Sequence, residues 1–333
     1  MVKKEPQTWR ELLGWIMSDP EEKQRIVEEL GMRTISVSRW VTGEADPLPR
    51  NLRRLLDALP QHREILYDLI SEEYPNFSDP ETDSSSKEIP AEFYARVLTS
   101  LASNAPTLRF WSIGNLILQQ ALGQLDPDRL GMAVTVARCM PPSYGQKVRS
   151  LRESIGMGTS PWAGDLEQKA MFLGAESLAG YVATSCRPAV NQNIRDEPSL
   201  LPTHQVEGEI SAAIYPILYA GRSAGCLLVS STQPNHFLLQ ARLTLIQQYA
   251  DLIALAFEPE EFYEPQDIQL RVMPSHSRQK LYFADFRQRV ANTMQESTDT
   301  DRPLNNIEAE QLVWQQLEEE LIELSAALPV GEC

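Results

Sequence analysis

Two runs of apolar residues near the N-terminus recur every three or four positions, which is typical of the buried face of a helix. The first run comprises Trp9, Leu12, Leu13, Ile16 and Met17, and the second Ile26, Val27 and Leu30. Gly31 is expected to end the second helix, because glycine readily adopts the left-handed conformation that closes a helix. A short third helix is predicted from about Arg33 to Thr42–Gly43, and Pro47 and Pro49 follow in a loop where a proline can open another helix.

The pattern predicts two unlike faces for the short third helix. Val37 and Trp40 lie three positions apart and are expected to face inward. The side chains left on the outer face are then Thr34, Ile35, Ser38 and Arg39. A hydroxyl, a methyl-bearing side chain and an arginine are groups that suit base edges in a DNA major groove.

The stretch from Leu30 to Leu59 resembles the helix-turn-helix of the Cro/repressor type, the xenobiotic-response-element (XRE) family. Its spacing is LG-(x)5-VSRW-(x)2-G-(x)3-P-(x)4-L-(x)2-L-(x)3-L, and the resemblance extends over residues 7–72. It implies a five-helix domain whose third helix docks in the major groove of an operator. Residues 19–22, Asp-Pro-Glu-Glu, depart from the glutamine and threonine usual at the start of the second helix. The DNA-contacting residues that it implies are Arg33, Thr34, Ile35, Ser38, Arg39, Arg50 and Arg53.

Charge is distributed unevenly along the chain. The net charge is −16, which excludes a protein that coats nucleic acid without discrimination. Between Arg33 and Arg54, five arginines and two acidic residues give +3, so the rest of the chain carries −19. Such segregation suits a confined DNA-binding face on an acidic body, and it is also compatible with a merely solvated helix surface.

The segment from Tyr74 to Pro90 is rich in serine, proline and aspartate, so it is predicted to be a linker. Two helical stretches follow it and are separated near Pro106. Each carries an apolar stripe that suits either a dimer interface or a cover on a sheet. The first stripe comprises Phe93, Val97, Leu98 and Leu101, and the second Leu108, Trp111, Leu116 and Leu122.

Beyond Gly131 the hydrophobic period changes to that of strands. The predicted strands are Met132–Arg138, Gln146–Ile155, Ile210–Tyr219 and Cys226–Ser231. The last two flank a short glycine-containing loop, Ala220–Gly225, and predict a β-hairpin. A long amphipathic helix is expected from about Phe237 to Phe257.

This order of elements, together with the string LGAESLAGYVATSCRPAVNQNIRDEP, resembles a GAF domain over roughly residues 90–260. The matching segments are Gly174–Val182, Pro188–Val190, Arg195–Pro198, Tyr215–Ile217 and Ala224–Cys226. The resemblance implies an antiparallel sheet with helices on one face and a small-molecule site on the other. The residues that it places around this site are Trp162, Phe172, Tyr181, Cys186, Arg187, Arg195 and Asp196.

Other interpretations of these residues stay open. The aromatic residues suit a core as well as a binding site, Asp196 suits a turn, and Arg195 suits an ion pair with an acidic neighbour. Cys186 is the one cysteine near the site, and no histidine follows it as in members that attach a chromophore. Gly156-Met-Gly158 departs from the dinucleotide pattern GxGxxG, so a dinucleotide site is not expected. No other motif identifies the effector or a cofactor, and both are unknown.

Cysteine and histidine spacing gives no metal motif, and a reduced, cytoplasmic compartment is the default. The cysteines are Cys139, Cys186, Cys226 and Cys333, and the histidines His62, His204, His236 and His276. No run of about twenty apolar residues is long enough to span a bilayer, and the polar N-terminus does not resemble a signal peptide.

The C-terminal segment carries a helical pattern and then a short heptad repeat. Its repeating apolar residues are Ile307, Trp314, Leu317, Leu321, Leu324 and Leu328. This helix could pair with its twin in a dimer or fold back on the preceding domain. The acidic run Glu318–Glu320 is expected to mark its solvated side.

The sequence predicts a multidomain protein with an all-α helix-turn-helix domain and an α+β GAF domain. The predicted parts are residues 1–73 (helix-turn-helix), 74–90 (linker), 91–260 (GAF) and 261–333 (helical extension). We expect a transcription regulator that binds double-stranded operator DNA as a homodimer and responds to a small molecule or to dimerisation. We expect it to have no enzymatic activity and no membrane partner.

Two alternatives stay open. One is a redox enzyme similar to the GAF-type free methionine sulfoxide reductases, which need several clustered cysteines where the sequence places only Cys186. The other is an adaptor whose helix-turn-helix binds protein instead of DNA.

Overall fold

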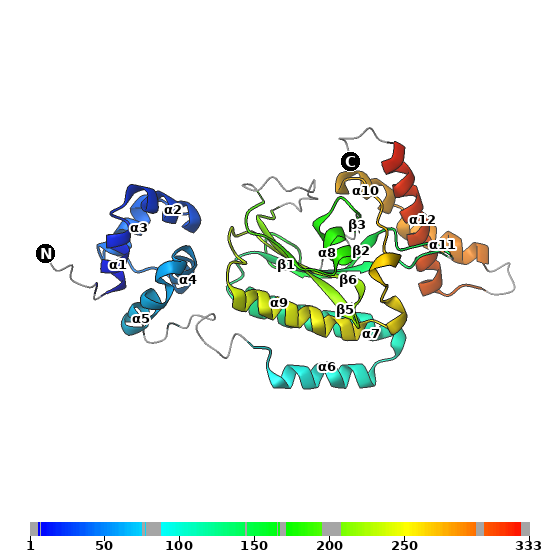
Figure 1. Ribbon diagram of the computed structural model, residues 1–333, viewed down its shortest axis with the longest axis horizontal. Helices are drawn as coiled ribbons and strands as arrows, with labels where there is room; N and C mark the ends of the chain where they lie inside the picture. Colours follow the sequence, from blue (N-terminus) through cyan, green and yellow to red (C-terminus); the bar gives the residue numbers. More distant parts are fainter. Residues whose placement is uncertain are drawn as a thin grey trace. The chain divides into compact units, whose positions relative to one another are not determined.

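The computed structural model describes residues 6, 8–74, 77, 88–143, 145–164, 166, 171–194, 208–297 and 303–327. The chain divides into two compact units, Met1–Glu88 and Ile89–Cys333, each with its own hydrophobic core. Figure 1 shows the first unit as a group of blue helices and the second as a sheet covered by helices.

The first unit consists of short helices whose ends are set by local signals. The helices are α1 (Trp9–Ile16), α2 (Pro20–Leu30), α3 (Thr34–Val41), α4 (Pro49–Ala58) and α5 (Arg63–Glu73), with a 3-10 turn at Pro60–His62. The side chains of Thr8 and Asp19 cap α1 and α2, and Gly31 ends α2 with a φ of 58°. Both predicted apolar runs lie on the core side of their helices, as expected for amphipathic helices.

The second unit is built on a six-stranded antiparallel sheet with the strand order β3-β2-β1-β6-β5-β4. The strands are β1 (Met132–Cys139), β2 (Leu151–Gly158), β3 (Phe172–Leu173), β4 (Ala189–Asn191), β5 (Ser211–Tyr219) and β6 (Arg222–Ser231).

Two predicted strand boundaries are corrected by the structure. The second strand starts at Leu151 and not at Gln146, because Val148 instead bridges the distant Ile268. The β5–β6 hairpin turns on Ala220 and Gly221 alone, with φ angles of 52° and 80°. Two left-handed residues make the tightest hairpin turn, so the rest of the predicted loop belongs to β6.

Helices cover both faces of the sheet (Figure 1). One face packs against α7 (Pro106–Leu125) and α9 (Gln240–Ile253), and α6 (Ala91–Ser103) lies against α7; α9 continues into a 3-10 turn at Ala254–Ala256. The opposite face packs against α8 (Leu178–Ser185), which covers β5 and β6.

The buried side of α7 differs from the predicted one. Its core residues are Phe110, Ile113, Ile117, Leu118 and Ala121, whereas Leu108 is 56% exposed. Trp111 is also exposed, and the other two members of the predicted stripe, Leu116 and Leu122, only flank the core. The helix is apolar around most of its circumference, so periodicity alone did not identify the side that faces the sheet.

The C-terminal helices are α10 (His276–Phe283), α11 (Phe286–Ser297) and α12 (Asn306–Ala327), which follow two 3-10 turns at Pro259–Glu261 and Pro265–Asp267. They fold back on the β3 edge of the same unit, where Val313, Leu317 and Leu321 are buried. None of the helices in the described residues combines the length and the hydropathy needed to cross a membrane.

The acidic run on α12 lies only in part on its solvated side, since Glu319 is exposed but Glu318 is buried. Glu318 is only 3% exposed, and its carboxylate accepts a 2.5 Å hydrogen bond from the Ser150 hydroxyl. Arg149 binds both Glu318 and Glu319, at 3.1 and 2.6 Å. The buried carboxylate is tolerated because these groups compensate it, and they lie far away in the sequence.

Candidate functional site

The outer face of α3 is the first candidate site. Val37 and Trp40 are buried as predicted, whereas Ile35 is 68% exposed. Thr34 and Arg39 are also exposed, and Ser38 is half-buried. The exposed isoleucine lies on the same short helix as an exposed hydroxyl and an exposed guanidinium. This face therefore offers hydrogen-bond donors, acceptors and a methyl surface together.

Further arginines precede and follow α3 in the chain. Arg33 precedes α3 as its N-cap, and Arg50 lies in the first turn of α4; both are exposed. Arg39 approaches Glu44 at 3.6 Å, but both side chains are mostly exposed, so this ion pair is weak. Arg53 is half-buried, with its guanidinium 6.0 Å from the ring of Phe77.

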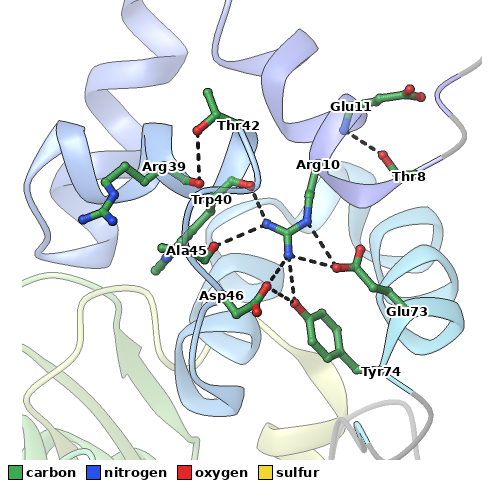
Figure 2. A network of polar contacts seen from close by, with 10 residues as sticks. All are labelled: Thr8, Arg10, Glu11, Arg39, Trp40, Thr42, Ala45, Asp46, Glu73 and Tyr74. Atoms are coloured by element: carbon green, nitrogen blue, oxygen red, sulfur yellow. Dashed lines mark hydrogen bonds and ion pairs between the residues drawn. The ribbon is translucent and has the colours of Figure 1, made fainter.

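Arg10 on α1 fixes the C-terminal end of α3 (Figure 2). Its guanidinium donates to the backbone carbonyls of Trp40 and Ala45 at 2.6 and 3.4 Å. It also binds the carboxylates of Asp46 and Glu73 at 2.6 and 2.9 Å, and only 15% of the side chain is exposed. One cation thus joins α1, the end of α3, the loop that follows α3, and α5.

A tyrosine completes this network. The Tyr74 hydroxyl lies 3.0 Å from the Arg10 guanidinium and donates to Asp46 at 3.1 Å. Burial raises the pKa of Tyr74 to about 12, so the hydroxyl keeps its proton and can continue to donate. The C-terminal end of α3 is therefore held by a network of hydrogen bonds and ion pairs from α1, the following loop and α5.

In the second unit the structure disperses the predicted ligand-binding residues. Phe172 is fully buried, and its ring packs against Phe283 and Trp314 of the C-terminal helices at 6.1 and 5.9 Å. Tyr181 is exposed on α8. Trp162 adjoins Gly158 at the end of β2, whereas Phe172 pairs with Arg152 near the start of this strand.

The remaining predicted residues divide into two groups. Cys186 ends α8 with a φ of 52° and is half-buried, and Arg187 beside it is exposed. Arg195 and Asp196 lie outside the described residues. The described members of the predicted set therefore do not form one cluster.

Three cysteines gather on the α8 side of the sheet, a feature that the sequence did not reveal. Cys139 and Cys226 are buried in the hydrophobic cluster beneath α8, and Cys186 is near enough to Cys139 to affect its pKa. Burial raises the pKa of the Cys139 thiol to about 12 and also raises the pKa values of Cys226 and Cys186. At neutral pH all three are protonated thiols, which are poor nucleophiles.

A polar group on the same side of the sheet was also missed. Glu153 on β2 is paired in register with Ala137, and Glu209 accepts a 2.6 Å hydrogen bond from the Ser230 hydroxyl. Desolvation, and secondarily the nearby Glu209, raise the pKa of Glu153 to about 8. The signal available in the sequence was an acidic residue in β2 at a position where the alternation of the strand leads one to expect an apolar residue. In the described residues no group of three or more histidines, cysteines or acids could hold a metal ion.

Comparison with protein families identifies the fold of the second unit. The family model for the GAF domain matches residues 113–258, from the middle of α7 to the end of the α9 region. Residues 113–258 form a GAF domain. The match lies wholly within the second unit and includes Glu153, Glu209 and the three clustered cysteines.

Solved structures similar to this GAF domain are distant in sequence. The GAF domain from Acinetobacter phosphoenolpyruvate-protein phosphotransferase is 13% identical, with a TM-score of 0.34, over 50% of this chain and 90% of that chain. Type II free methionine-R-sulfoxide reductase from Thermoplasma acidophilum is 14% identical, with a TM-score of 0.33, over 47% of this chain and 99% of that chain. No curated protein matches the chain.

Proposed function

We propose that this protein is a one-component transcription regulator whose first unit is a helix-turn-helix that binds double-stranded DNA and whose GAF domain senses a small molecule. The proposal rests above all on α3, which buries Val37 and Trp40 and exposes Thr34, Ile35 and Arg39. An eight-residue helix is about 12 Å long, which is comparable to the width of a B-DNA major groove.

The side chains on and around α3 suit two kinds of contact. Arg39 is long enough to bind the acceptor edge of guanine in a bidentate manner, and Ile35 offers an apolar contact to a thymine methyl group. Arg33 and Arg50 flank the helix and suit phosphate groups on the two sides of a groove. Base contacts would give specificity, and phosphate contacts would give affinity that depends on salt.

We further propose a homodimer, because two recognition helices are needed to bind adjacent half-sites. Exposed apolar side chains on α6 and α7 supply a candidate interface within the second unit: Tyr94, Leu98, Leu108 and Trp111. Pairing two weakly binding first units raises affinity through effective concentration. We also propose a cytoplasmic location, because the protein must have access to its operator.

Selection of genomic fragments on the immobilised full chain tests the proposed function. We expect enrichment of a few related sequences with two-fold symmetry, and loss of that enrichment in Arg39→Ala. Arg287→Ala on α11 is the matched control, since it removes an exposed arginine from the second unit. Equal enrichment by Arg39→Ala would contradict the proposal, and capture of proteins without DNA would favour an adaptor.

A redox enzyme is the second candidate, because Cys139, Cys186 and Cys226 lie on one side of the sheet. The raised thiol pKa values oppose it, since a nucleophilic cysteine needs an accessible thiolate. We therefore propose a non-enzymatic protein. Turnover of free methionine sulfoxide with a dithiol reductant, abolished by Cys186→Ser, would instead support the enzyme.

A further inference from the structure

The chain that follows α5 docks back onto the core of the first unit. Tyr74 and Phe77 lie where the sequence predicts a linker to begin, yet Phe77 is only 8% exposed and belongs to that core. Its ring lies 6.2 Å from the ring of Tyr67 on α5, and its backbone N–H donates to the Tyr74 carbonyl at 2.8 Å. Tyr74 packs against the same core. We call Tyr74 and Phe77 the junction, because the chain passes from them towards the second unit.

The Tyr74 side of the junction is joined to the end of α3 by a series of polar contacts (Figure 2). The Tyr74 hydroxyl donates to the Asp46 carboxylate at 3.1 Å, and this carboxylate binds the Arg10 guanidinium at 2.6 Å. Arg10 in turn donates to the Ala45 carbonyl at 3.4 Å, and the Ala45 N–H donates to the Arg39 carbonyl at 3.3 Å. The backbone of Arg39, the proposed base-reading residue, is therefore coupled to the junction.

The Phe77 side of the junction supports a second residue of the proposed DNA-binding face. The Arg53 guanidinium on α4 lies 6.0 Å from the centre of the Phe77 ring, within the range of a cation–π contact. A ring beside the guanidinium restricts the rotamers of this long side chain, which lowers the entropy that binding to a phosphate would cost. The junction therefore reaches the DNA-binding face through two helices, α3 from the Tyr74 side and α4 from the Phe77 side.

We propose that the junction controls the DNA-binding face. Docking of Tyr74 and Phe77 holds α3 and Arg53 in the arrangement that binds DNA, and release of the junction lowers operator affinity. Both are positioning residues, which act through Arg10 and Arg53. Along the chain, a pull from the GAF domain reaches the junction before it reaches any helix of the first unit. The inference rests on the proposed DNA-binding function and names the point at which that function is regulated.

Coupling of this kind is reciprocal. If docking of the junction raises the affinity for DNA, bound DNA stabilises the docked junction by the same factor. The contact at stake on the Tyr74 side is a hydrogen bond to a carboxylate, and its loss changes an equilibrium constant by about tenfold. We therefore expect an effect of that size on the backbone at the end of α3 and on operator affinity.

Hydrogen–deuterium exchange of the full chain tests the junction without DNA. Tyr74→Phe removes the hydroxyl and keeps the ring, and Tyr67→Phe, which removes a hydroxyl from the neighbouring ring, is the matched control. We expect Tyr74→Phe to speed exchange of the amides that end α3, those of Thr42, Gly43 and Ala45, by about tenfold. The amides of α2 should exchange at the wild-type rate in both variants, whereas a general loss of stability would speed both groups.

Gel-shift titration with the selected operator measures the effect on DNA binding. We expect Tyr74→Phe to raise the dissociation constant about tenfold with an unchanged salt slope, because it removes no charge from the DNA-binding face. Phe77→Leu keeps an apolar side chain in the core and removes the ring beside Arg53, so it should weaken binding several-fold. Tyr67→Phe should bind as the wild type does. Addition of operator to the wild type should slow exchange of the Phe77 amide, as reciprocity requires.

The outcomes separate the junction from the proposed DNA-binding function. Wild-type exchange at the end of α3 in Tyr74→Phe, equal acceleration of α2, or wild-type operator affinity in Tyr74→Phe and Phe77→Leu overturns control by the junction. A chain that selects an operator and gives any of these results keeps the regulator. A chain that selects no operator loses the regulator, and exchange of the Thr42, Gly43 and Ala45 amides still decides whether the junction holds α3.

Discussion

The α3 face of the first unit and the α8-side face of the GAF sheet are organised in opposite ways. The α3 face exposes an arginine, a hydroxyl and Ile35 to solvent, and Arg10 holds the end of the helix by binding the Trp40 carbonyl and the carboxylates of Asp46 and Glu73. The sheet face instead holds Glu153 where desolvation makes its charge unfavourable. A surface that must search for a large polyanion stays exposed and charged, whereas a site for a small ligand gains strength from restricted access to water.

The substitution with the largest expected effect removes the core beneath the α3 face. Trp40→Ala removes an almost fully buried indole from the core of the first unit, and we expect a loss of about 3–5 kcal/mol. Thermal unfolding of the full chain should then show the first unit melting early while the GAF transition is unchanged. Ile35→Ala is the control, since its exposed side chain should shift neither transition. Equal loss of both transitions would show that the two units do not unfold independently.

The pH dependence of the GAF transition tests the other face. Folding raises the pKa of Glu153 from 4.5 to about 8, so the folded state holds this proton more tightly than the unfolded chain. Its stabilising contribution is complete below pH 4.5 and is lost as the pH rises towards 8. Because Glu153 is partly exposed, we expect the free energy of unfolding to decline by only about 2–4 kcal/mol over this range. Denaturant unfolding between pH 4 and 9 should show a decline in the free energy of unfolding that is smaller in Glu153→Gln by this amount; parallel curves for both proteins would refute this assignment.

Arg10→Met sharpens the comparison by removing the central cation of the first unit. It leaves the carboxylates of Asp46 and Glu73 facing each other without their shared cation, so we expect a loss of about 2–3 kcal/mol. Arg25→Met is the matched control: its side chain is 39% exposed, and its pairs should contribute at most about 1 kcal/mol. Urea unfolding measures both. Equal effects would mean that the Arg10 network is no more than a set of surface ion pairs.

Local signals explain why the helices of the first unit could be predicted closely. Gly31 and Pro49 mark helix ends through their own backbone preferences, and Val37 and Trp40 are assigned to the core by spacing alone. None of these inferences depends on which distant residues the side chains contact.

The features that the sequence did not reveal depend on contacts between distant segments. Glu318 is buried because Arg149, distant in the chain, approaches it from the sheet. Glu153 lies on the same face of the sheet as Cys226 because β-sheet register pairs both residues with Ala137. An irregularity in the β1–β2 register between Val136 and Ala137 further disturbs the alternation of β2, so the facing of its side chains cannot be read from the period alone.

The most direct test of the central proposal, DNA binding through α3, is a gel-shift titration of the selected operator against single-base variants over a range of salt concentrations. We expect Arg39→Ala to cost about 1–3 kcal/mol and to relax the preference for one base. Arg50→Ala should weaken all sequences alike and lower the salt slope by about one unit, while Arg287→Ala changes nothing. Equal salt slopes and an unchanged base preference in all three variants would contradict the account.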